Sequence, residues 1–242
     1  EVQNYKVQLL GKKRHDYFVG IWVNRNAKRK RPNDVLESWS LFLKNLQKKE
    51  GHRKAVLIMH TEPSDQEGPN LYKTSEMLGI QDNVFFSRDR LEFEKMNVLY
   101  NISDFCLNMS YAEGFGLSTL ESMMTGTPIV AAKTGGLTKQ VCNSISSGEN
   151  GVALDIDFKT LVGSQTVPYI YEDYVSNKNV ANGIMKLYKM SDTKKHKLSK
   201  KVLKYANTAF GHQKTIDLWH NTMLDTLNKF KEKKKSYTVT VY

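Results

Sequence analysis

One stretch near the middle of the chain combines glycines, carboxylates and hydroxyls in a pattern that could bind a phosphate. It reads Ser-Tyr-Ala-Glu-Gly-Phe-Gly-Leu-Ser-Thr-Leu-Glu over residues 110–121, between a predicted strand and a predicted helix. Its glycines let the backbone approach a ligand closely. The amides of Gly116, Leu117 and Ser118 would begin the helix, where free donors and the helix dipole bind phosphate.

Two carboxylates accompany these glycines. Glu121 lies inside the predicted helix, where its carboxylate could accept hydrogen bonds from a ribose diol. Glu113 lies in the turn, at the carboxyl edge of the predicted sheet, which is the edge at which open α/β sheets bind ligands. The alternative is structural: Glu113 caps the helix and Glu121 is a surface residue.

Six short apolar strands, separated by helices, must position these residues. The strands are predicted at residues 17–23, 55–59, 84–86, 105–109, 129–132 and 151–154. Helices are predicted to begin at residue 32 and to span 71–78, 91–100, 117–125 and 138–142, and a helical pattern runs from 174 to about 227. Continuous apolar strands between helices are typical of a doubly wound parallel α/β sheet that is covered on both faces.

We predict a single Rossmann-like domain over residues 1–242, with helical additions at its C-terminus. The strand at 151–154 is expected to be the last strand, and residues 156–173 are expected to form an irregular insertion. Two tyrosines of this insertion, Tyr169 and Tyr171, could meet an acceptor. Trp219 is expected to pack the final helix against the body of the domain.

The central stretch has a wider pattern around it. Its two glutamates have the spacing Glu-x7-Glu, and the chain continues as Ser-Met-Met-Thr-Gly-Thr-Pro-Ile-Val-Ala and then Gly135-Gly136. This pattern closely resembles the nucleotide-sugar half of retaining glycosyltransferases of family 4. That family has the GT-B architecture of two facing Rossmann-like domains, and the resemblance runs from roughly Tyr17 to Leu154.

The resemblance implies a role for each residue of the stretch. Glu113 would touch hydroxyls of the donor sugar, and Glu121 would hold the ribose. The amides of Gly116 and Leu117 would meet the diphosphate. The donor-binding turn would also include Gly114, Phe115 and Ser118, and Phe86 and Ser87 end the third predicted strand, where the family commonly lodges the base.

The resemblance also assigns two cations. In this family the first strand usually ends in Gly-Arg, with Lys-Gly five residues after the arginine. Arg25 and Lys30 keep this spacing, whereas Asn24 and Arg31 stand where the family has glycine. Arg25, Lys30 and the helix amides would stabilise the charge of the leaving diphosphate without a metal. The alternative for Lys28-Arg-Lys-Arg31 is a solvated basic run or a nucleic-acid patch, and we expect Lys28, Arg29 and Arg31 to face water.

Two further features offer other chemistry. Asp155-Ile-Asp157 follows a strand, and such a pair can hold a divalent cation beside a nucleotide sugar, but a metal would want more oxygen ligands. We therefore predict no metal and no cofactor other than the donor substrate. His60 closes a predicted strand at the ligand edge, where it either approaches the base or is a satisfied loop histidine.

Composition excludes several classes of protein. Hydrophobic residues make up 40% of the 242 residues, which is typical of a globular chain and not of a disordered one. The two cysteines, Cys106 and Cys142, form no Cys/His cluster, so a structural zinc site is excluded and a buried Cys106 is expected. No apolar run approaches the ~20 residues of a membrane-spanning helix. A cytoplasmic location is expected.

The formal charge of +11 is clustered in the sequence. Residues 1–31 carry nine basic and two acidic side chains, and residues 186–204 carry eight lysines and one aspartate. Such clusters are solvated faces, or they bind an anionic ligand, nucleic acid or an anionic membrane surface. A non-enzymatic basic binding module is therefore the alternative function.

We predict the donor-binding domain of a retaining glycosyltransferase. It would take a UDP-, GDP- or ADP-linked sugar, with no nucleic-acid partner and with peripheral membrane contact left open. Two facing domains normally need well over 242 residues, and one Rossmann-like unit is visible in the sequence. We therefore expect the acceptor-binding domain to be missing and the chain alone to turn over poorly.

Overall fold

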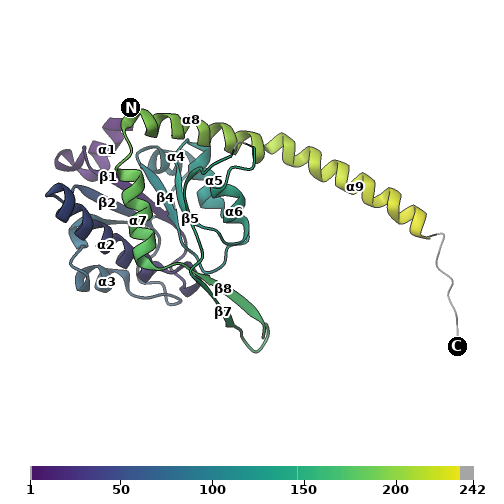
Figure 1. Ribbon diagram of the computed structural model, residues 1–242, viewed down its shortest axis with the longest axis horizontal. Coiled ribbons are helices and arrows are strands. Elements are labelled where there is room, and N and C mark those ends of the chain that lie inside the picture. Colours follow the sequence, from purple (N-terminus) through teal and green to yellow (C-terminus); the bar gives the residue numbers. More distant parts are fainter. Residues whose placement is uncertain (1, 146, 235–242) are drawn as a thin grey trace.

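The computed structural model describes residues 2–145 and 147–234. Its centre is a six-stranded parallel sheet of order β3-β2-β1-β4-β5-β6, with helices on both faces (Figure 1). The strands of this sheet are β1 Phe18–Val23, β2 Ala55–His60, β3 Val84–Ser87, β4 Phe105–Asn108, β5 Ile129–Ala132 and β6 Gly151–Leu154. The predicted doubly wound α/β class is confirmed.

The helices follow the predicted alternation with small shifts at their ends. They are α1 Val2–Leu10, α2 Pro32–Glu50, α3 Leu71–Met77, α4 Phe93–Asn101, α5 Leu117–Met124, α6 Gly135–Val141, α7 Asn177–Tyr188, α8 Asp192–Ala209 and α9 His212–Lys234. Helix α1 was not predicted. Helix α6 begins at Gly135, three residues before its predicted start at residue 138, so it includes the glycine pair.

The strands are apolar throughout because both faces of the sheet are buried. Along β1, Phe18 and Trp22 enter one core with α2 and α7. The alternate residues Val19 and Ile21 enter the other core, which includes residues of α4, α5 and α8. Successive side chains of a strand point to opposite faces, so a strand between two helical layers has no polar face. Cys106 is fully buried as expected, and burial raises the pKa of its thiol to about 12.

The order of the strands places a topological switch point between β1 and β4 at the carboxyl edge, the position at which open α/β sheets have a central crevice. From β1 the chain builds outward through β2 to β3, then returns to place β4 on the other side of β1. The loops that follow β1 and β4 therefore leave the sheet toward opposite faces. Open α/β sheets bind ligands at such a switch point. A ligand site is therefore expected between the loops at residues 24–31 and 109–116.

Two expectations about the C-terminal third were wrong. Residues expected to be irregular form an antiparallel hairpin, β7 Phe158–Val162 and β8 Ile170–Tyr174, which projects from the sheet (Figure 1). The aromatic and β-branched residues of both arms favour strands, and they pair around a turn that starts at Gly163.

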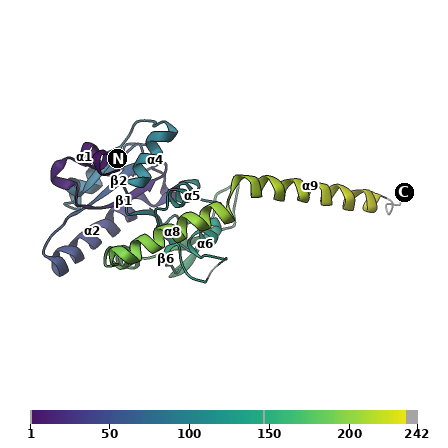
Figure 2. The same cartoon turned by 90° about the horizontal axis from the view of Figure 1, so that it is seen from above.

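Helix α9 does not pack on the domain. Trp219 is 64% exposed, and the helix extends away from the rest of the molecule in both views (Figures 1 and 2). No helix in the part of the chain that the structure describes is long and apolar enough to cross a membrane.

Candidate active site

An ion pair lies at the central crevice. The ammonium of Lys30, from the loop after β1, contacts the carboxylate of Glu113, from the loop after β4. The two side chains are 13% and 12% exposed, so the pair is largely shielded from water. The amide of Tyr111 also donates to the carbonyl of Arg29 at 3.0 Å, which joins the two loops through their backbones. Two predicted catalytic residues that are 83 positions apart in the sequence thus meet.

The loop after β1 holds its cations in a short 3-10 turn, Lys28–Lys30. Arg29 donates to the carbonyl of Ala112, and its guanidinium is 3.8 Å from the Glu113 carboxylate, although half of the side chain is exposed. The side chain of Arg31 is fully buried. Lys28 is exposed, as expected, and Arg29 is half-exposed although it also contacts the loop after β4. The expectation that Arg31 faces water was wrong, because the loop after β4 supplies it with the carbonyl of Met109 and the ring of Tyr111.

Arg25 lies on the same loop but its side chain takes other partners. Its Nε is 2.9 Å from Asp65 and its Nη1 is 3.2 Å from Glu67, both in the loop after β2. The hydrogen bond with Asp65 raises the pKa of Arg25 and lowers the pKa of that aspartate. Arg25 is 61% exposed and, with the 3-10 turn and Glu67, lines a hollow of about 600 Å³. The cation is thus at the rim of the crevice and not in contact with Glu113.

The glycine turn of the loop after β4 is supported from behind by α6. Gly116 has a φ of +89° and is the N-cap of α5, with no side chain capping the helix. The amide of Gly136 donates to the carbonyl of Glu113 at 3.0 Å. A Cβ on Gly136 would lie 2.4 Å from the carbonyl oxygen of Gly114, so a larger residue there would displace the turn.

Gln140 completes this support. Its side-chain amide donates to the carbonyls of Phe115 and Gly116 at 2.6 and 3.1 Å. Gln140 was not predicted as a site residue, since a lone glutamine in a short helix carries no signal of its own. The carbonyls of the turn are thus directed toward α6, while α5 starts at Leu117, which is 68% exposed. The first amides of a helix have no acceptor within the helix, which leaves this end suited to an anion.

Glu121 is engaged elsewhere. It lies one turn inside α5 and is exposed, and its carboxylate accepts a hydrogen bond from the hydroxyl of Tyr100 on α4 at 2.7 Å. Burial and this bond raise the pKa of Tyr100. The structure therefore brings Lys30 and Glu113 together, and places Glu121 beside a different helix.

The residues predicted near the base lie in one row along the carboxyl edge. The parallel register aligns Val23 of β1 with His60 of β2, and His60 with Ser87 of β3. His60 Nδ1 is 2.9 Å from the Ser87 hydroxyl, and burial lowers the pKa of His60. Phe86 packs edge-on against Tyr72 at 4.9 Å between ring centroids.

Asp155 and Asp157 have protein partners. Asp155 is 2.6 Å from Lys133, and Asp157 accepts hydrogen bonds from the amide of Ser176 and the side chain of Asn179 at the start of α7. Within residues 2–145 and 147–234, no three His, Cys, Asp or Glu side chains are grouped in a way that could hold a metal ion.

Comparison with known proteins identifies the family. A family model described as glycosyl transferases group 1 matches residues 10–157, which is more than half of the chain. The chain belongs to this family. The matched residues include the crevice loops, the glycine turn and the row of residues at the carboxyl edge, so the resemblance to glycosyltransferases seen in the sequence is confirmed.

Curated relatives of this group 1 glycosyl transferase chain include inositol-phosphate enzymes. It is 30% identical over 134 residues to D-inositol 3-phosphate glycosyltransferase 2 of Catenulispora acidiphila, covering 54% of this chain and 31% of the relative. It is 38% identical over 76 residues to D-inositol 3-phosphate glycosyltransferase of Mycolicibacterium smegmatis, covering 31% of this chain and 17% of the relative. The chain thus spans less than a third of these relatives.

Solved structures share the fold. HepE of Anabaena, solved in complex with UDP and glucose, superposes with a TM-score of 0.65 at 19% identity, covering 90% of the group 1 chain and 52% of HepE. The C-terminal domain of a group 1 glycosyl transferase, LpcC of Francisella tularensis, superposes with a TM-score of 0.58 at 20% identity, covering 81% and 87% of the two chains. At such identities the likeness is one of fold.

Proposed function

We propose that this chain is the donor-binding part of a retaining glycosyltransferase that uses a nucleoside-diphosphate sugar. The observation that carries the proposal is the shielded Lys30–Glu113 pair at the switch-point crevice, close in sequence to an uncapped helix start. Membership of the group 1 family supports sugar transfer, and the UDP in the HepE structure makes UDP the first nucleotide to test. GDP and ADP are the other two candidates.

The cations suit the departure of a diphosphate. As the bond to the sugar breaks, negative charge accumulates on the leaving phosphate, and fixed positive groups stabilise it. Lys30 and Arg29 supply that charge from the loop after β1, and the first amides of α5 supply partial positive charge from the other side of the crevice. Arg25 would add a third cationic side chain if its guanidinium exchanged Asp65 for the diphosphate as its ion-pair partner. The leaving phosphate would then accept the acceptor proton, and we expect no metal requirement.

Glu113 has a different role in this proposal. It neutralises Lys30, and its carboxylate would accept hydrogen bonds from hydroxyls of the donor sugar once a phosphate becomes the partner of Lys30. Glu121 would hold the ribose while it keeps or releases its bond to Tyr100. Phe86 and Ser87 stand where the base would lie, next to His60.

The acceptor belongs to a region outside this chain in our proposal. The chain spans less than a third of its curated relatives, and one doubly wound sheet is present in the described residues. The acceptor-binding domain would face the crevice from the other side. Contact of the assembled enzyme with a membrane surface, in a cytoplasmic setting, would bring acceptor and donor together.

Isothermal titration with UDP, GDP and ADP tests the proposal. We expect one of the three to bind, and Lys30→Ala to weaken that binding at least tenfold because a shielded cation is lost. Lys48→Ala is the matched control, since Lys48 is exposed at the far end of α2 and its loss changes the net charge equally. Absence of binding by all three nucleotides, or equal affinities of the two variants, would contradict the proposal. Unchanged affinity in excess EDTA is expected.

A further inference from the structure

Arg31 combines two features that are rarely found together. Its backbone has φ +56° and ψ +44°, and within the described residues it is the one non-glycine residue with a positive φ. Its side chain is also fully buried. Left-handed backbone is disfavoured for residues with a Cβ, so the surrounding structure must hold Arg31 in place.

Two aromatic rings and an acid provide that support. The guanidinium carbon lies 4.7 Å from the ring centroid of Tyr111 and 4.3 Å from that of Tyr174, so the cation covers both rings. Its Nε is 3.0 Å from Asp34, and Asp34 in turn accepts a hydrogen bond from Asn177. Cation–ring contacts in a desolvated setting are strong enough to fix an arginine in one position.

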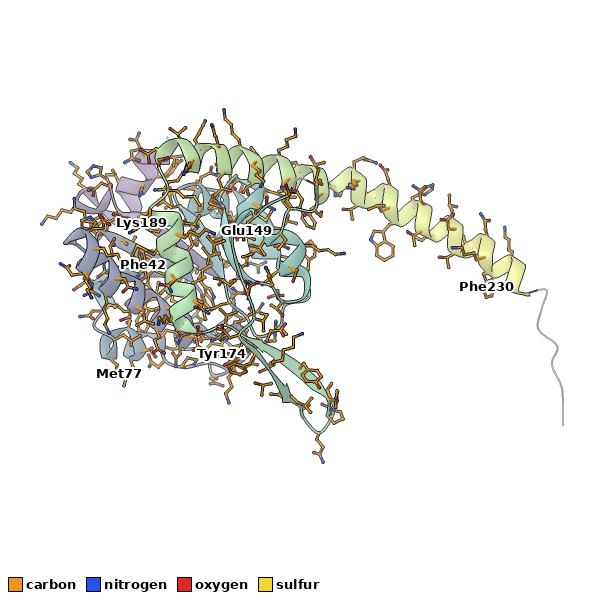
Figure 3. The ribbon with its side chains drawn as sticks, viewed as in Figure 1. Phe42, Met77, Glu149, Tyr174, Lys189 and Phe230 are labelled. Carbon is orange, nitrogen blue, oxygen red and sulfur yellow. The ribbon has the colours of Figure 1, made fainter. Side chains whose placement is uncertain are left out.

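These partners come from parts of the fold that surround the crevice. Tyr111 is in the loop after β4, two residues before Glu113, and Tyr174 ends β8 at the base of the projecting hairpin (Figure 3). The amide of Asp173 donates to the carbonyl of Tyr111 at 2.8 Å, which docks the hairpin on that loop. Arg31 therefore ties the residue after Lys30 to the loop that carries Glu113 and to the hairpin.

We propose that Arg31, seated on Tyr111 and Tyr174, is a positioning residue that acts through Lys30, and that the base of the β7–β8 hairpin is part of the support for the donor site. The backbone conformation at residue 31 sets the direction of the turn that presents Lys30, and the rings hold that conformation. Arg31 itself does not touch the donor. The inference rests on the proposed donor-binding function.

A double-mutant cycle measured by UDP titration tests this role on the full chain. Glycine tolerates the left-handed backbone, so Arg31→Gly removes the anchored side chain without adding strain. We expect UDP affinity to fall about fivefold to tenfold in Arg31→Gly and further in Lys30→Ala. In the double variant we expect Arg31→Gly to add less than a twofold loss, because its effect is transmitted through Lys30.

Variants at the second ring separate positioning from general destabilisation. Tyr174→Leu removes the ring and should weaken UDP binding as Arg31→Gly does, whereas Tyr174→Phe keeps the ring and should restore wild-type affinity. If thermal unfolding shows that Arg31→Gly does not fold, the UDP affinity of Tyr174→Leu tests the positioning role of Arg31 instead.

The possible outcomes distinguish this inference from the function on which it rests. Wild-type protein that binds none of UDP, GDP and ADP overturns both. Binding that is lost in Lys30→Ala but unchanged in Arg31→Gly and Tyr174→Leu overturns the positioning role alone. The positioning role is also overturned if the loss of UDP affinity in the double variant equals the product of the losses in Arg31→Gly and Lys30→Ala. Arg31 would then affect UDP binding independently of Lys30.

Discussion

Replacing Glu113 by glutamine should separate the binding of nucleotide from the binding of sugar. Glu113 neutralises Lys30, so its carboxylate would compete with a diphosphate for the same ammonium. Glu113→Gln removes that competing charge and keeps the shape of the side chain. We therefore expect UDP to bind the variant at least as tightly as it binds the wild-type protein, while the additional affinity of UDP-glucose over UDP is lost.

The same substitution should lower stability by an amount set by the burial of the pair. Breaking a buried ion pair costs about 3–5 kcal/mol. The side chains of Lys30 and Glu113 retain 13% and 12% exposure, and glutamine still accepts a hydrogen bond. We therefore expect a loss of about 1–3 kcal/mol, because solvent and the remaining bond compensate in part. In a chain of this size that lowers the thermal midpoint by about 2–12 °C.

Thermal unfolding with and without saturating UDP measures both the stability loss in Glu113→Gln and the change in its UDP binding. Because UDP supplies a new anionic partner for Lys30, it should raise the midpoint of Glu113→Gln by more than it raises that of the wild-type protein. Lys30→Met instead removes the cation that would bind the phosphate. It should weaken UDP binding by about 1.5–3 kcal/mol, which is the contribution of a hydrogen bond to a charged group. Glu50→Gln, at the exposed end of α2, is the charge-matched control.

One result would refute this reasoning directly. If UDP binds Glu113→Gln as poorly as it binds Lys30→Met, the two residues act as one unit toward the phosphate. The assignment of the carboxylate to the sugar would then be wrong. A stability loss in Glu113→Gln that UDP does not repair would lead to the same conclusion.

Three further predictions use other parts of the site. Asp65→Asn removes the shorter of the two ion pairs of Arg25 and leaves the pair with Glu67. UDP affinity in titrations should therefore rise about twofold to fivefold at low ionic strength and show no gain near 0.5 M salt, because salt screens exposed ion pairs; an equal gain at both salts would contradict this. Gly136→Ala should cost about 1–3 kcal/mol in denaturant unfolding and weaken UDP binding, because the added Cβ meets the glycine-turn backbone; an unaltered midpoint would count against it. Burial lowers the pKa of His60, so its contribution to stability is present above about pH 6.5 and is lost as pH falls through the lowered value. His60→Gln should therefore reduce the loss of stability between about pH 6.5 and 5, and an unchanged pH profile would exclude this role.

Much of the fold followed from local sequence patterns. The apolar runs at residues 55–59 and 105–109 are strands because a strand covered by helices on both faces needs no polar alternation. The Glu-x7-Glu stretch was recognised as a glycine turn and helix start from its residue types alone, and the family match confirms its context. The hairpin escaped prediction because its strands face solvent and lack the continuous apolar run of the central sheet.

The sequence by itself determined the class of fold, the alternation of strands and helices from β1 to β6, and the glycosyltransferase family, because turns, caps and buried strands depend on neighbouring residues. Tertiary structure alone decided which side chains share the site. Lys30 meets Glu113 because β4 returns to lie beside β1, Arg25 turns to Asp65 because β2 lies on the other side, and Arg31 is buried because a distant hairpin brings Tyr174 to it. Contacts of this kind depend on strand order, and no local pattern of residues encodes strand order.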